Sequence, residues 1–131
     1  MTQAAQSARR SQLDYSQGKQ LAIQVFLDAM ATLDLRSAML ARLKPEGELL
    51  MADGASLPLS RSPRVVAFGK AANRMAAVLD EILRGRIEAG VCVSPGEPSR
   101  KVDHFRYFLG GHPYPRPGSL EGACAALDAE I

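Results

Sequence analysis

Residues 64–84 contain the sharpest change of hydrophobic pattern along the chain. Four consecutive apolar residues at 65–68 predict a strand that is covered on both faces, as the central strand of a parallel sheet is. Gly69 ends this strand. From residue 71 to residue 84 the apolar positions recur at helical spacing, which predicts a helix. The segment therefore predicts a strand, a tight turn and a helix in succession.

Two more strands are predicted downstream, at 90–93 and at 105–109. The helix between the first two strands makes them the parallel strands of a βαβ unit. This order of elements predicts an α/β fold, a Rossmann-like three-layer sandwich around a mostly parallel sheet. In such sheets, ligands bind just beyond the carboxyl ends of the strands.

The chain before this sheet is predicted to be a polar arm followed by two helices. Residues 1–17 lack a hydrophobic period, so they are expected to be disordered or docked on a partner, and the domain itself is expected to span 18–131. One helix is predicted from Gly18, and Asp34 can cap a shorter one that runs to about Leu43. We expect the two helices to form a helical hairpin packed on one face of the sheet.

Two further elements are predicted from turn and cap signals. Asp53-Gly54 predicts a tight turn between two short strands, at 49–51 and 56–57. Ser119 is predicted to cap a last helix, whose pattern continues to the final residue without a stop signal, so a truncated polypeptide is expected. The apolar stripe of this helix consists of Leu120, Ala123, Cys124, Leu127 and Ile131.

Composition narrows the function classes. The chain has 131 residues, 47% of them hydrophobic, which suits one globular domain. Its 16 basic and 14 acidic residues are too balanced for binding to nucleic acid. Membrane association is not expected, because no apolar run approaches the roughly 18 residues of a membrane span. Arg9-Arg10 is not followed by the apolar segment of an export signal, so a cytoplasmic location is expected.

The chain shows no pattern of a metal site or of a nucleophilic triad. Cys92 and Cys124 lie in a predicted strand and a predicted helix, where small buried thiols are expected rather than a disulfide. Two histidines and two dispersed cysteines do not have the spacing of zinc ligands, and no metal site is predicted.

Lys70 is the first candidate functional residue, because it follows Gly69 at the predicted strand-to-helix turn. A helix N-terminus attracts anions, and a lysine beside it costs about 0.3–1 kcal/mol when nothing negative is bound. A bound phosphate or carboxylate would reverse that cost. The alternative is a solvated surface lysine. The turn matches neither a Walker A loop nor a dinucleotide-binding fingerprint.

His112 is the second candidate. It follows Gly110-Gly111 and precedes Pro113, which places it on a stiff loop at a strand end. It could bind an anion or move a proton. Alternatively, it holds the loop by a hydrogen bond to the backbone.

Two stretches resemble a known family. They are V-V-A-F-G-K-A-A-N-R-M-A at 65–76 and G-H-P-Y-P-R-P-G-S-L-E-G-A at 111–123. Both are similar to the amino-terminal region of glycerate 2-kinases of the MOFRL type, which are often labelled hydroxypyruvate reductases. The resemblance extends over about 18–131.

The resemblance implies transfer of a phosphoryl group from ATP to the 2-hydroxyl of D-glycerate, giving 2-phosphoglycerate, with a divalent metal such as Mg²⁺. Lys70 stands at the position of the family's proposed active-site residue, and Gly69, Lys70 and His112 would contact the glycerate substrate. No nucleotide-binding residue is identified. The Gly- and Ser-rich segments and the MOFRL domain of these enzymes are missing, so this chain is expected to be an amino-terminal fragment that is inactive alone. The alternative is a non-catalytic module that binds a small anion or forms a homo-oligomer.

Overall fold

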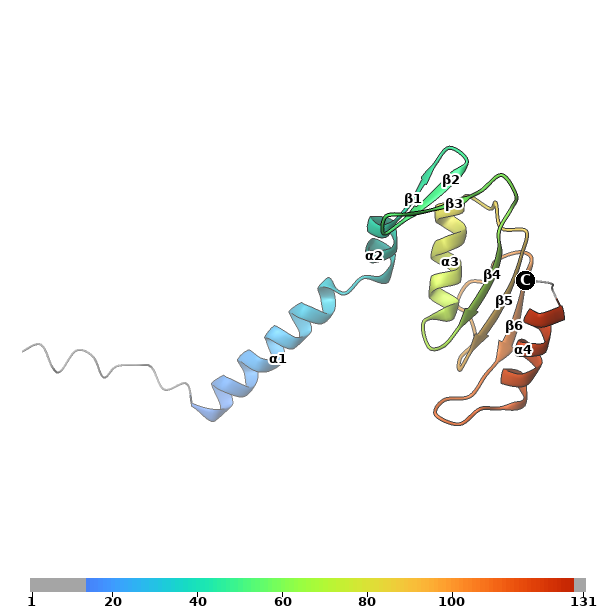
Figure 1. Cartoon of the computed structure of the whole chain (residues 1–131). Helices are drawn as coiled ribbons and strands as arrows, with labels where there is room; N and C mark the ends of the chain where they lie inside the picture. Colours follow the sequence, from blue (N-terminus) through green and yellow to red (C-terminus); the bar gives the residue numbers. More distant parts are fainter. Residues whose placement is uncertain (1–13, 129–131) are drawn as a thin grey trace, which may run out of the picture. The chain divides into compact units, whose positions relative to one another are not determined.

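The structure, a computed structural model, describes residues 14–128 (Figure 1). The chain divides into two compact units, Met1–Asp34 and Leu35–Ile131. The first contains one helix, α1 (Tyr15–Thr32). The carboxylate of Asp14 accepts hydrogen bonds from the backbone N–H groups of Ser16 (2.6 Å) and Gln17 (3.1 Å). The Gln17 side chain accepts one in return from the Asp14 N–H, so a capping box starts the helix.

This cap corrects the predicted start of the first helix. The helix begins at Tyr15 rather than at Gly18, so the last residues of the predicted polar arm are helical. The capping pair Asp14 and Gln17 explains the earlier start. The rest of the predicted arm, residues 1–13, lies outside the described part of the chain.

The second unit opens with helix α2 (Leu35–Arg42) and a small antiparallel sheet. Its strands β1 (Leu43–Glu46), β2 (Leu49–Ala52) and β3 (Ala55–Pro58) pair in the order β1-β2-β3. Asp53 and Gly54 form the predicted tight turn, with φ angles of 46° and 88°. Strand β1 was not predicted, because Pro45 was interpreted only as a helix stop. Proline is tolerated there because β1 is an edge strand.

The main sheet consists of three parallel strands in the order β4-β5-β6. They are β4 (Arg64–Phe68), β5 (Ala89–Ser94) and β6 (Phe105–Leu109). Helix α3 (Ala72–Leu83) connects β4 to β5, and helix α4 (Pro117–Asp128) follows β6. The predicted α/β fold with a parallel sheet is confirmed.

The two helices cover opposite faces of the sheet, as Figure 1 shows. The thiol of Cys92 on β5 donates a hydrogen bond to Asn73 of α3. The next side chain, Val93, packs against Gly122 of α4. Successive side chains of a strand point to opposite faces, so α3 and α4 make two outer layers around the sheet.

The prediction of a central, fully covered strand at 65–68 is wrong. Strand β4 lies at the edge of the described sheet, and β5 is the central strand. Val66 remains 41% exposed and Phe68 80% exposed, whereas Cys92 on β5 is 0% exposed. The cause is the position of α4, which packs on β5 and β6.

The predicted stripe of α4 is also wrong within the described residues. Leu120 and Leu127 are 70% and 79% exposed, and Cys124 is exposed. The buried residues of this helix are Gly122 and Ala125, because small side chains let the helix approach the sheet closely. Ile131 lies outside the described residues.

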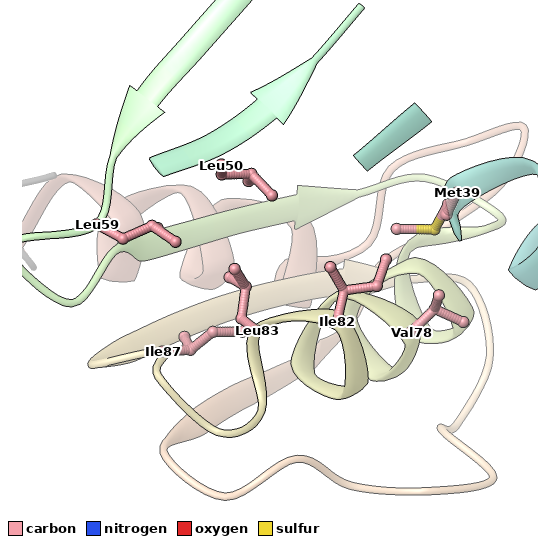
Figure 2. Close-up of a cluster of buried hydrophobic side chains, with 7 residues drawn as sticks. All are labelled: Met39, Leu50, Leu59, Val78, Ile82, Leu83 and Ile87. Atoms are coloured by element: carbon pink, nitrogen blue, oxygen red, sulfur yellow. The ribbon is translucent and has the colours of Figure 1, made fainter. Parts of the chain in front are cut away.

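Helix α2 and the small sheet share one hydrophobic cluster with α3 (Figure 2). Its side chains come from α2, β2, α3 and the segments before β4 and β5. They are Met39, Leu50, Leu59, Val78, Ile82, Leu83 and Ile87. Helix α2 thus packs on α3 and β1, while the predicted pairing of the first two helices as a hairpin stays a prediction.

A search of residues 14–128 finds no helix that combines the length and the apolar character needed to cross a bilayer.

Candidate functional site

The carboxyl ends of the three parallel strands meet at one edge of the sheet, which we call the rim. Backbone hydrogen bonds tie these ends together. Gly69, after β4, donates from its N–H to the carbonyl of Val93 at 3.0 Å. Gly110, after β6, donates to the carbonyl of Ser94 at 2.9 Å. The rim therefore consists of the turn 69–71, the first residues of the loop 95–104 and the loop 110–116.

Lys70 lies at the rim as predicted, in the turn that leads into α3. Its side chain is exposed and makes no hydrogen bond or ion pair with any other described residue, 14–128. The ammonium group is thus available to an anion from solvent. Lys70 is the only residue of the turn 69–71 with a charged side chain.

The conformation of the turn 69–71 leaves the N-terminus of α3 accessible to a ligand. Gly69 has a φ of 107°, in the region that favours glycine, and the helix begins after Ala71 with no side-chain cap. The N–H of Ala72 donates to the carbonyl of Gly69 at 3.2 Å, whereas the next N–H groups of the first turn have no partners within the helix. Together with the positive end of the helix dipole, they favour a bound negative charge beside Lys70.

The loop 110–116 is held by more contacts than the turn 69–71. A β-carbon on Gly111 would collide with the carbonyl oxygen of Tyr114, so only glycine fits there. Ser119, the predicted cap, lies inside α4 instead, because the helix begins at Pro117. Its hydroxyl accepts hydrogen bonds from the N–H groups of Gly111 (3.3 Å) and Arg116 (3.4 Å). The loop is therefore pinned to the first turn of α4.

His112 stands on this pinned loop with an exposed side chain, and its peptide bond to Pro113 is cis. The ring makes no hydrogen bond to the described residues, so the interpretation that His112 holds the loop is wrong. Ser119 has that role. The histidine ring is free to meet a ligand.

The structure brings Lys70 and His112 to the same rim but not into contact. Strand β5 separates β4 from β6, and neighbouring strands are about 4.8 Å apart, so the two strand ends are about 10 Å apart. Whether Gly69, Lys70 and His112 bind one substrate stays a prediction.

Asn73 is a rim residue that sequence reasoning missed. Its amide nitrogen donates to the carbonyl of Gly96 at 2.7 Å, and its amide oxygen accepts from the Cys92 thiol at 3.2 Å. Burial raises the pKa of this thiol, so it stays protonated and can donate. The sequence signal that could have pointed to Asn73 is its amide side chain in the first helical turn after Lys70.

The loop 95–104 is also anchored to α3 by ion pairs. Arg100 lies 2.9 Å from a carboxylate oxygen of Asp80 and 3.1 Å from one of Glu81, both on α3. Arg36 of α2 also pairs with Glu81, at 3.0 Å. These pairs are partly exposed, and such pairs typically contribute at most about 1 kcal/mol each.

A cavity of about 20 Å³ lies between α3, the start of the loop 95–104 and strand β6, and is lined in part by Asn73, Gly96 and Tyr107. This volume holds about one water molecule, so it is too small for glycerate. A ligand would therefore bind on the open surface of the rim. Within residues 14–128, no three His, Cys, Asp or Glu side chains come together as a metal site would require.

Comparisons with known proteins agree with this architecture. The sequence profile of a family described as a domain of unknown function, DUF4147, matches residues 21–130. A glycerate 2-kinase from Pyrococcus horikoshii is 27% identical over 109 residues, which cover 83% of this chain and 24% of that protein. The crystal structure of the PH0495 protein from the same organism superposes with a TM-score of 0.68 at 26% identity, over 85% of this chain and 25% of that one. The chain thus spans about a quarter of the length of these relatives.

Proposed function

The chain belongs to the DUF4147 family, and on this premise we propose that it is the amino-terminal domain of a glycerate 2-kinase. The complete enzyme would phosphorylate D-glycerate at its 2-hydroxyl with ATP. In that reaction the hydroxyl oxygen bonds to the γ-phosphorus, the bond from phosphorus to ADP breaks, and the hydroxyl proton is released. The products are 2-phosphoglycerate and ADP.

One observation carries the proposal. Lys70 projects from an uncapped helix N-terminus at the carboxyl edge of the parallel sheet, without a partner among residues 14–128. Phosphoryl transfer depends mainly on positioning and on stabilising charge. A free ammonium group beside backbone N–H donors supplies both for a small anion.

Lys70 would clamp either the substrate carboxylate or the phosphoryl group in transfer. In the first role it orients the 2-hydroxyl, and in the second it stabilises the charge that develops in the transition state. Gly69 would let the backbone approach the anion closely, because it carries no side chain. His112 would face the same ligand from the loop on the other side of β5.

We propose that ATP and Mg²⁺ bind in a complete enzyme to residues outside the rim. Within residues 14–128, the rim contains neither a phosphate-binding glycine-rich loop nor a cluster of carboxylates. The 131-residue chain alone is expected to show no ATP-dependent phosphorylation of glycerate in a coupled assay.

The role of Lys70 can be tested in a complete enzyme that carries this domain. Lys70→Ala is expected to lower kcat/KM about 10²–10³-fold, as the loss of one charge-stabilising donor commonly does. Lys44→Ala removes an exposed lysine from β1 and is the matched control. Unchanged kcat/KM in the Lys70 variant would overturn the assigned role.

A second candidate function is an oligomerisation module, and the uncovered side of β4 favours it. Val66 and Phe68 line an apolar groove of about 450 Å³ together with Leu127 of α4. Such exposed apolar surfaces often mark interfaces. A monomer–dimer equilibrium that Phe68→Asp abolishes would support this function, and a strictly monomeric chain would contradict it.

A further inference from the structure

We propose that Asn73 is a positioning residue that latches the loop after β5 to the first turn of α3 and so fixes the rim around Lys70. The positioning role rests on the proposed anion site. The latch itself rests on two hydrogen bonds of one side chain. No contact between Asn73 and substrate is invoked.

The two hydrogen bonds fix the orientation of the amide. A buried, protonated thiol can donate to an amide oxygen, so the oxygen of Asn73 faces Cys92. The amide nitrogen then necessarily faces the other way, toward the carbonyl oxygen of Gly96 at 2.7 Å. A carbonyl can only accept, so both contacts agree with a single amide orientation.

Through Asn73, the latch connects helix α3, strand β5 and the loop after β5. Asn73 lies three residues after Lys70, in the first turn of α3. Cys92 is a fully buried residue in the middle of the sheet, with 0% exposure, so it is a fixed anchor. Gly96 lies near the start of the loop 95–104, and Arg100 in the middle of that loop pairs with Asp80 of α3. Asn73 therefore closes the end of the loop that lies nearer to Lys70.

The hydrogen bond from Asn73 to Gly96 also affects anion binding at the N-terminus of α3. The carbonyl oxygen of Gly96 is an acceptor next to the uncapped N-terminus of α3. Without a donor of its own, it could turn toward the free N–H groups of the helix and occupy the place of an anion. By donating to this oxygen, Asn73 keeps those N–H groups open to a ligand.

The test uses the 131-residue chain and measures both loop order and anion affinity. NMR order parameters of the Gly96 and Glu97 backbone are expected to fall from about 0.85 to below about 0.6 in Asn73→Ala. The dissociation constants for D-glycerate and inorganic phosphate are expected to rise roughly two- to tenfold, the range for the loss of one hydrogen bond. Asn73→Asp keeps the size of the side chain but cannot donate in its ionised form, so its order parameters should fall in the same way even if Asn73→Ala folds poorly. Its anion affinity is not compared, because the added negative charge would itself repel an anion.

Two controls separate this role from a general effect on stability. Gln24→Ala removes an amide that bonds to Asp28 on α1 at 2.8 Å, and it should change neither readout. Cys92→Ala removes the anchoring bond but keeps the bond from Asn73 to Gly96, so the order parameters should fall less than in Asn73→Ala.

Each possible result decides a different point. Unchanged order parameters in both Asn73 variants would overturn the latch. A disordered loop with unchanged anion affinity would overturn the positioning role. No anion binding by the unaltered chain would overturn the proposed site at Lys70 and the positioning role with it, while the order parameters would still decide whether the latch exists.

Discussion

The turn after β4 and the loop after β6 leave the same edge of the sheet, yet side chains hold only one of them. The turn 69–71 is held by backbone hydrogen bonds of Gly69, and a β-carbon there would meet no atom within 4 Å. The loop 110–116 is closed on itself at Gly111 and pinned by Ser119. The turn 69–71 exposes the ammonium group of Lys70, and the loop 110–116 exposes the imidazole of His112.

This difference separates two kinds of residue. Changes in the packed loop should act mainly on stability, because its backbone is in contact with α4. Changes at the open turn should act mainly on ligand binding, because the exposed side chain of Lys70 makes no hydrogen bond or ion pair with residues 14–128.

The largest expected effect on stability is that of Gly111→Ala. The added β-carbon would collide with the carbonyl of Tyr114, so the free energy of unfolding should fall by roughly 1–3 kcal/mol, as for other overpacked sites. Urea unfolding followed by circular dichroism measures it. Gly96→Ala is the matched control, because a β-carbon there meets nothing within 4 Å. Equal losses in the two variants would contradict a closed loop.

Ser119→Ala should have a smaller effect. It removes one acceptor from the N–H groups of Gly111 and Arg116, so the free energy of unfolding should fall by about 1 kcal/mol. The same urea experiment applies, with Ser99→Ala in the exposed loop after β5 as control. An unchanged midpoint would show that the hydroxyl does not pin the loop.

The buried thiol of Cys92, on the central strand β5, predicts that the stability of the fold depends on pH. Burial raises the pKa of Cys92 above its ordinary value of 9.0, so the folded state holds this proton more tightly than the unfolded state. Stability should be full below pH 9 and should fall as the pH rises through the region above it, since only the unfolded chain ionises there. Cys92→Ala should flatten the fall between pH 9 and 10. Burial also raises the pKa of Tyr107 above 10.0, so some loss should remain at higher pH.

The smallest effect on stability is expected for His112→Ala. The ring makes no hydrogen bond within residues 14–128, so the free energy of unfolding should stay within about 0.5 kcal/mol of the unaltered value. Thermal unfolding measures this. A loss above 1 kcal/mol would mean that the histidine supports the loop after all.

The sequence predicted the elements whose signals are local. Asp53-Gly54 specified a turn by its tolerance of positive φ angles, and the change of period at Gly69 located the strand-to-helix junction. That junction placed Lys70 at the rim. The resemblance to glycerate 2-kinases agrees with the 27% identical glycerate 2-kinase from Pyrococcus horikoshii.

The errors concern contacts between elements distant in sequence. The apolar run 65–68 is typical of a covered strand, but the cover depends on where α4 packs. The predicted stripe of α4 follows helical spacing alone, whereas the close approach of Gly122 to Val93 buries Gly122 and Ala125 instead. The bond from Asn73 to Gly96 joins residues far apart in the chain, so no local pattern could show it.

The most direct test of the account is a calorimetric titration of D-glycerate into the 131-residue chain and into its Lys70→Ala variant. We expect saturable binding to the unaltered chain, at least about tenfold weaker binding to the variant, and the same unfolding midpoint for both, because Lys70 makes no contact that supports the fold. Equal affinities in the two proteins would contradict the assignment of Lys70 as the anion-binding residue.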